Sequence, residues 1–165
     1  MTTSLKQFVP SEVCLKCNGC CRYKEENSVW RPKLGQGDQV HLADLITAGD
    51  IDAQAYIKTM EICHEHFCRF LKTKDNTCNI YAKRPFECTL YPFILSQTLD
   101  AVKVYVHLSC PYVQDHQHRA DFEVYVGYLK EFFQRGEIRE FLELNKGMFH
   151  DYSRYAPELL HLFDL

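Results

Sequence analysis

Cysteine is the residue that most constrains this chain, because nine of its 165 residues are cysteines. All nine precede residue 111, at Cys14, Cys17, Cys20, Cys21, Cys63, Cys68, Cys78, Cys88 and Cys110. Disulfide frameworks are typical of small secreted chains, but here the count is odd, no hydrophobic leader is expected, and 46% of the residues are hydrophobic. Since that many apolar residues can build a core without crosslinks, we expect the thiols to bind metal.

The densest cysteine motif is C-x2-C-x2-C-C, which runs from Cys14 to Cys21. Gaps of two residues let a tight loop bring two sulfurs to one metal ion, and Asn18-Gly19 is a good turn pair for such a loop. Adjacent side chains usually diverge, so Cys20 and Cys21 are not both expected on one tetrahedral ion. One of the two is therefore predicted to face a second centre or to support the ligands from outside.

Four later cysteines supply further thiols, namely Cys68, Cys78, Cys88 and Cys110. The resulting eight suit two four-sulfur sites, one cluster with a smaller site, or a single site with a reactive remainder. Cys63 is left over and is expected to be a buried apolar residue. Arg84, which precedes a proline, is a candidate donor to negatively charged thiolates, and packing over Tyr81 is its alternative role.

Iron and zinc both bind such residues. Cys14, Cys17 and Cys20 resemble the first three cysteines of a bacterial ferredoxin run, and Cys110-Pro111 supplies a remote cysteine followed by proline. This pattern favours an iron-sulfur cluster, for example a 4Fe-4S cluster, or another iron centre. Zn2+ is the alternative, because zinc sites also combine paired cysteines with distant ligands.

Several spaced motifs occur in one order: C-x2-C-x2-C-C, C-x-F-L from Cys68, C-x-I-Y-x2-R-P-x2-C from Cys78, and Y-P-F from Tyr91. Over residues 14–111 they resemble the YkgJ family, also called the CxxCxxCC family of zinc- or iron-chelating proteins. Thr89 departs from the basic residue that many relatives have after the last motif cysteine. The resemblance implies metal chelation by Cys14, Cys17, Cys20, Cys21, Cys68, Cys78, Cys88 and Cys110, with Arg84-Pro85 as the family's arginine-proline pair.

The function expected from these residues is metal binding in electron transfer, metal handling or partner binding. One alternative is a protein-modifying metalloenzyme, because a longer branch of the family resembles a flagellin lysine N-methylase. Another is a thiol-based redox or metal sensor that uses Cys20 and Cys21. Whether the chain is an enzyme stays open, since the sequence shows neither a nucleophile-base-orienter set nor the glycine-rich turn of an adenosylmethionine-binding domain.

Charge and hydropathy narrow the choice of partners. The net charge of -3 argues against nucleic acid or an acidic membrane surface as a partner, and a protein partner stays open. No apolar stretch is long enough to cross a bilayer. We therefore expect a soluble, cytoplasmic protein.

The expected fold class is α+β, mostly helical, with one domain over residues 1–165. It would combine a metal-chelating region at 14–111 with a helical packing region at 112–165. Alternating apolar residues predict a strand at 102–108, and apolar stripes predict helices from Asp121 to Gly136 and at 137–145. Weaker patterns predict two short helices within 38–60, a helical turn at 80–83, and a packing helix or tail at 157–163.

Overall fold

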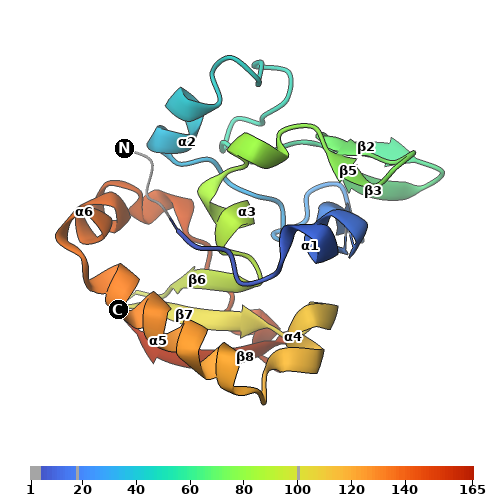
Figure 1. The fold of residues 1–165 in the computed structure, drawn as a ribbon. Helices are drawn as coiled ribbons and strands as arrows, with labels where there is room; N and C mark the ends of the chain where they lie inside the picture. Colours follow the sequence, from blue (N-terminus) through green and yellow to red (C-terminus); the bar gives the residue numbers. More distant parts are fainter. Residues whose placement is uncertain (1–4, 18, 100) are drawn as a thin grey trace. The chain divides into compact units, whose positions relative to one another are not determined.

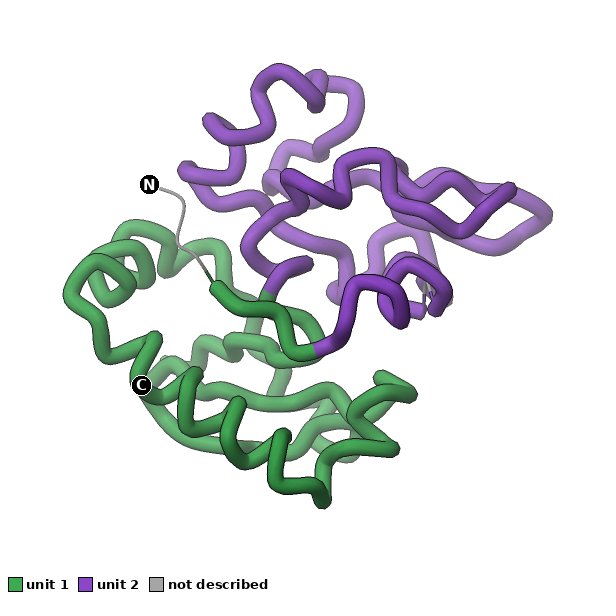
Figure 2. Tube along the Cα trace, viewed as in Figure 1, with its two compact units in different colours: residues 1–8, 90–165 green, residues 9–89 purple. Residues whose placement is uncertain are grey.

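The structure is a computed structural model that describes residues 5–17, 19–99 and 101–165 (Figure 1). The chain forms two compact units (Figure 2), of which unit 1 comprises residues 1–8 and 90–165 and unit 2 comprises residues 9–89. Helices and several antiparallel sheets make the fold α+β. With 40% of residues helical and 22% in strands, the expectation "mostly helical" is not supported. The single domain over residues 1–165 stays a prediction.

Unit 2 is built from short elements around a small apolar core. The β1-β3-β2 sheet and the β4-β5 hairpin are both antiparallel. The core contains Leu42, Ile57 and Phe67. In chain order the elements are α1 (Ser11–Cys17), η1 (Gly19–Cys21), β1 (Arg22–Tyr23), α2 (Gln36–His41), β2 (Thr59–Ile62), β3 (Glu65–Cys68), β4 (Leu71–Lys72), β5 (Thr77–Cys78), η2 (Tyr81–Lys83) and α3 (Phe86–Leu90), whose last residue belongs to unit 1.

Unit 1 packs helix α5 against an antiparallel sheet of order β6-β7-β8. The ring of Phe93 in β6 stacks on Phe122 of α5, with 5.9 Å between the ring centroids. Phe93 and Leu129 are fully buried, so the contact between sheet and helix forms the core of this unit. Its elements are β6 (Phe93–Gln97), β7 (Val102–His107), α4 (Pro111–His116), α5 (Ala120–Gln134), α6 (Gly136–Leu144), η3 (Lys146–Met148), η4 (Ser153–Glu158) and β8 (Leu159–Asp164).

The elements with the clearest periodicity are confirmed. Strand β7 covers the alternating segment, and α5 and α6 cover the two apolar stripes. The turn at 80–83 is η2, which ends before Pro85. Gly136 opens α6 instead of ending α5, because extended backbone at Arg135 separates the two helices.

Three weaker predictions are wrong. The segment 157–163 is mainly strand β8, since it finds hydrogen-bonding partners along β7. Cys14 and Cys17 lie on helix α1 instead of a loop, while Asn18 lies outside the described residues. Within 38–60 only α2 forms, because the Asp52 carboxylate accepts hydrogen bonds from the backbone N–H groups of Gln54 and Tyr56 and favours a turn.

Cys63 is exposed, so its expected burial is also wrong. It forms a two-residue turn with His64 between the paired residues Ile62 and Glu65. Both turn residues have positive φ values, 52° for Cys63 and 66° for His64, which suit the twist of a tight hairpin. Their place at the tip of the hairpin keeps them away from the core.

The helices of the described residues include none that is long and apolar enough to cross a membrane.

Candidate metal centre

Seven of the eight predicted thiols lie in unit 2. Cys14 and Cys17 lie three residues apart on α1, a spacing that places both on one face of the helix. The 3-10 helix η1 carries Cys20 and Cys21. Three other elements supply one thiol each: β3 carries Cys68, β5 carries Cys78 and α3 carries Cys88.

Four of these thiols, which we call the central thiols, are Cys20, Cys68, Cys78 and Cys88. Each lies within electrostatic range of the other three. Burial raises the pKa of Cys88 well above its ordinary value, and the charges of Cys68, Cys20 and Cys78 raise it further. Burial likewise raises the pKa of Cys78. Four thiolates within electrostatic range of one another would repel one another, so ionisation of all four is favoured by a bound cation.

Cys21 lies between two of the central thiols. Its thiol donates hydrogen bonds to the sulfurs of Cys20 and Cys68, which raises the pKa of Cys21. The same hydrogen bonds lower the pKa of Cys20 and of Cys68, although burial of both thiols acts in the opposite direction. Cys20 and Cys21 therefore occupy different positions in the cluster despite being adjacent in the chain.

Backbone groups also donate to two of the central sulfurs. The N–H groups of Phe70 and Leu71 point to Cys68, and the N–H of Ile80 points to Cys78. N–H···S hydrogen bonds stabilise a sulfur that carries negative charge, and supporting hydrogen bonds of this kind orient metal ligands. The loops after β3 and β5 are thus suited to hold thiolates.

Tyr23 is a residue that sequence reasoning missed. Its side chain is buried, and desolvation together with the charges of Cys68, Cys21, Cys88 and Cys20 raises its pKa well above the usual value. The hydroxyl faces Cys68, but within the described residues it makes no hydrogen bond of ordinary geometry. A buried hydroxyl of this kind can donate to a thiolate or to a sulfide. Its position two residues after Cys21 was the only hint in the sequence.

Arg84 combines the two roles considered for it. Its guanidinium carbon lies 4.1 Å from the centroid of the Tyr81 ring. Its charge also acts on Cys14, Cys20 and Cys78, where it opposes the effect of burial on the thiol pKa. Tyr81 in turn hydrogen-bonds to Cys14. Arg84 is therefore placed to compensate part of the negative charge that ionised thiols would carry.

The chemistry of the donor set fits zinc or iron, since both metals bind thiolates in groups of four. The side chains are not arranged in coordination geometry, however. Within residues 5–17, 19–99 and 101–165, no group of three His, Cys, Asp or Glu side chains is placed to bind one metal ion. Cys21 hydrogen-bonds to Cys20 and to Cys68. A bound metal would replace those protons and draw the sulfurs together.

The last predicted thiol and two histidines near the cysteines in the sequence lie as follows. Cys110 is a buried residue of unit 1 at the N-cap of α4, and its role as a ligand stays a prediction. The Nδ1 atom of His107 lies 3.2 Å from the hydroxyl of Tyr91. His64 is exposed at the hairpin tip, where its Nδ1 lies 3.5 Å from a carboxylate oxygen of Glu61.

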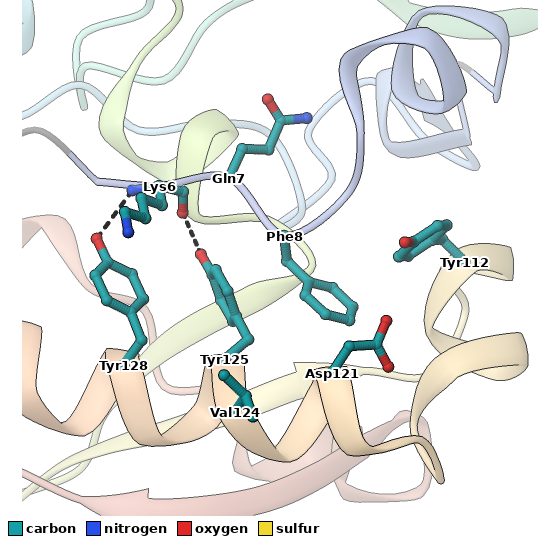
Figure 3. Close-up of a pocket in the computed structure, with 8 residues that line it drawn as sticks. All are labelled: Lys6, Gln7, Phe8, Tyr112, Asp121, Val124, Tyr125 and Tyr128. Atoms are coloured by element: carbon teal, nitrogen blue, oxygen red, sulfur yellow. Dashed lines mark hydrogen bonds between the residues drawn. The ribbon is translucent and has the colours of Figure 1, made fainter.

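Unit 1 also contains a groove of about 490 Å³ beside α5 (Figure 3). The backbone of Lys6 is held there by the hydroxyls of Tyr125 and Tyr128. The ring of Phe8 packs against Tyr112 with 5.3 Å between the centroids. The eight residues that line the groove include no cysteine and no histidine, so they offer no soft metal ligand.

Comparison with known proteins identifies the family of the chain. Residues 13–120 match the CxxCxxCC family, which is described as a putative zinc- or iron-chelating domain. The match covers well over half of the 165 residues, so the chain belongs to the CxxCxxCC family. No curated protein and no solved structure matches the chain.

Proposed function

We propose that unit 2 binds a zinc or iron centre through the central thiols Cys20, Cys68, Cys78 and Cys88. The observation that supports this set is that all six pairs among the four thiols interact electrostatically. Four sulfurs complete the coordination of one zinc ion or of one 4Fe-4S cluster. The family description supports chelation of the same two metals.

The chain's own residues would prepare these thiols for binding. Backbone N–H groups after Cys68 and Cys78 orient the two sulfurs and stabilise their negative charge. Arg84 supplies a positive charge near Cys20 and Cys78. When bound, the metal centre would supply the further positive charge that keeps the thiols deprotonated at neutral pH.

The other thiols of unit 2 have supporting places in this proposal. Cys21 donates to two of the central sulfurs, which matches a residue that supports the ligands from outside. Cys14 and Cys17 share one face of α1 and lie near Cys20, so a second centre would use these two. A metal-binding module for electron transfer, metal handling or partner binding is the biological role that we propose for the chain.

Serine substitutions test the ligand set. We expect Cys68→Ser and Cys88→Ser, purified anaerobically as full chains, to lose most of the metal that copurifies with the wild type. Cys63→Ser is the matched control, because its thiol is exposed at a hairpin tip. Circular dichroism of each variant separates loss of ligands from loss of fold. Wild-type metal content in both Cys68→Ser and Cys88→Ser would refute the proposed ligand set.

A further inference from the structure

Two cysteines of unit 2 lie at the same end of an antiparallel pair of strands. In the β1-β3 ladder Arg22 pairs with Phe67, and Tyr23 pairs with His66. Cys21, the last residue of η1, directly precedes Arg22, and Cys68 directly follows Phe67. The hydrogen bond from the Cys21 thiol to the Cys68 sulfur shows independently that the two side chains meet.

This geometry is suitable for a disulfide. The neighbouring residues Arg22 and Phe67 are directly opposite in the ladder, where Cα atoms are about 4.5 to 5.5 Å apart, and disulfides span Cα distances of about 4.4 to 6.8 Å. Cys20 also contacts Cys21, but a bridge between adjacent residues would close a strained ring that includes their peptide bond. Cys21 and Cys68 are therefore better placed for a disulfide than Cys20 and Cys21.

We infer that Cys21 and Cys68 form an oxidative modification site, at which a peroxide-class oxidant closes a disulfide between them and removes Cys68 from the metal site. The effect on metal binding rests on the proposed function, whereas the disulfide itself does not. Since one sulfur cannot serve in both bonds, bound metal and the Cys21-Cys68 disulfide exclude each other.

The reaction balances with one peroxide molecule. The sulfur of one cysteine of the pair attacks one peroxide oxygen. The O–O bond breaks, a sulfenic acid forms, and the first water leaves. The sulfur of the other cysteine then attacks the sulfenic sulfur, the S–O bond breaks, and the second water carries away the remaining proton. Two thiols lose two electrons and two protons in total, and hydrogen peroxide becomes two molecules of water.

The test uses the metal-loaded full chain and diamide, a two-electron oxidant that reacts with thiols. Metal release is followed with a coloured chelator, and disulfides are mapped by mass spectrometry after the free thiols are alkylated. We expect metal to leave as a peptide pair linked through Cys21 and Cys68 accumulates. In Cys21→Ser, which keeps the central thiols, release should be at least tenfold slower. Cys63→Ser should behave as the wild type does.

Two results would overturn the inference. One is a disulfide that maps to another pair, such as Cys14 with Cys17 or Cys20 with Cys21. The other is equally fast release from Cys21→Ser and from the wild type. If the wild type holds no metal at all, the proposed function fails. Disulfide mapping in that same protein still tests whether Cys21 and Cys68 form a disulfide.

Discussion

The carboxylate of Asp38 accepts a hydrogen bond from the backbone N–H of Phe86, the first residue of α3, at 2.9 Å. Its second oxygen accepts a hydrogen bond from the N–H of Gly35 at 3.1 Å. Helix α3 carries Cys88, so a residue far away in the sequence fixes the start of the helix that presents a proposed ligand. Burial raises the pKa of Asp38, which is consistent with a carboxyl group held inside the fold.

Replacement of Asp38 tests this cap. We expect Asp38→Ala to lower the free energy of unfolding by about 1 to 2 kcal/mol, because two backbone N–H groups lose their acceptor. Asp44→Ala is the control, since Asp44 forms an exposed ion pair with Lys83 and should cost clearly less than Asp38→Ala. Urea denaturation of the two variants measures both effects. An equal decrease in the free energy of unfolding in both variants would show that the hydrogen bonds of Asp38 do not stabilise the fold.

The hydroxyl of Tyr23 gives a prediction that depends on the metal. In the metal-loaded protein, we expect Tyr23→Phe to lose about 1 kcal/mol of stability, because the hydroxyl donates to a thiolate in that state. Without the metal, the protonated thiol that faces the hydroxyl is a weaker acceptor, so removal of the hydroxyl should then be neutral or stabilising. Denaturation with and without a chelator compares the two states. A loss of the same size in both states would contradict this role.

Arg84 and its neighbour Lys83 form a matched pair for a test of charge. Arg84→Gln should weaken metal binding by about 10- to 100-fold, because the positive charge near Cys14, Cys20 and Cys78 disappears. Lys83→Gln removes the same charge from an exposed ion pair and should leave the affinity close to that of the wild type. Competition with a metal chelator measures both variants. Equal affinity for the two would remove Arg84 from the site.

His107 predicts how the stability of the protein depends on pH. Burial lowers the pKa of His107 below its ordinary value of 6.5, and Glu158 acts in the opposite direction. The folded protein therefore binds fewer protons at this residue than the unfolded chain does, and the free energy of unfolding should decrease as the pH falls through 6.5. Thermal unfolding between pH 8 and pH 5 should show this decrease in the wild type and a weaker one in His107→Phe.

Glu158→Gln is the second variant for this site. It should lower the pKa of His107 further, because the hydrogen bond and the charge that favour the protonated ring are lost. NMR titration of the imidazole measures the change directly. A rise in the pKa of His107 would show that Glu158 does not act on it in this way.

The sequence predicted those elements whose pattern repeats over several turns or alternations. The apolar stripe from Phe122 to Phe133 identified α5, and the alternation of β7 identified the central strand of its sheet. Strand β8 was missed because its run of Leu and Phe shows no strict alternation, and only pairing with β7 makes it a strand. Local patterns thus predict long regular elements and fail where a distant partner decides the structure.

The candidate metal centre was likewise predicted only in part. Spacing identified the thiols as candidate ligands, but it could not show that Cys20 interacts with Cys78 and Cys88 while Cys21 donates to Cys68. Those relations depend on how η1, β3, β5 and α3 fold together. The place of Tyr23 among the sulfurs also depends on that folding, since a tyrosine in a two-residue strand has no distinctive sequence signal.

Metal and sulfide analysis of the full chain, purified without oxygen, is the most direct test of thiol-based metal binding. We predict a stoichiometric amount of zinc, or of iron with an equal amount of acid-labile sulfide, together with protection of the central thiols from alkylation until a chelator is added. A protein that purifies without either metal, takes up neither on reconstitution, and exposes Cys20, Cys68, Cys78 and Cys88 equally to alkylation would contradict the account.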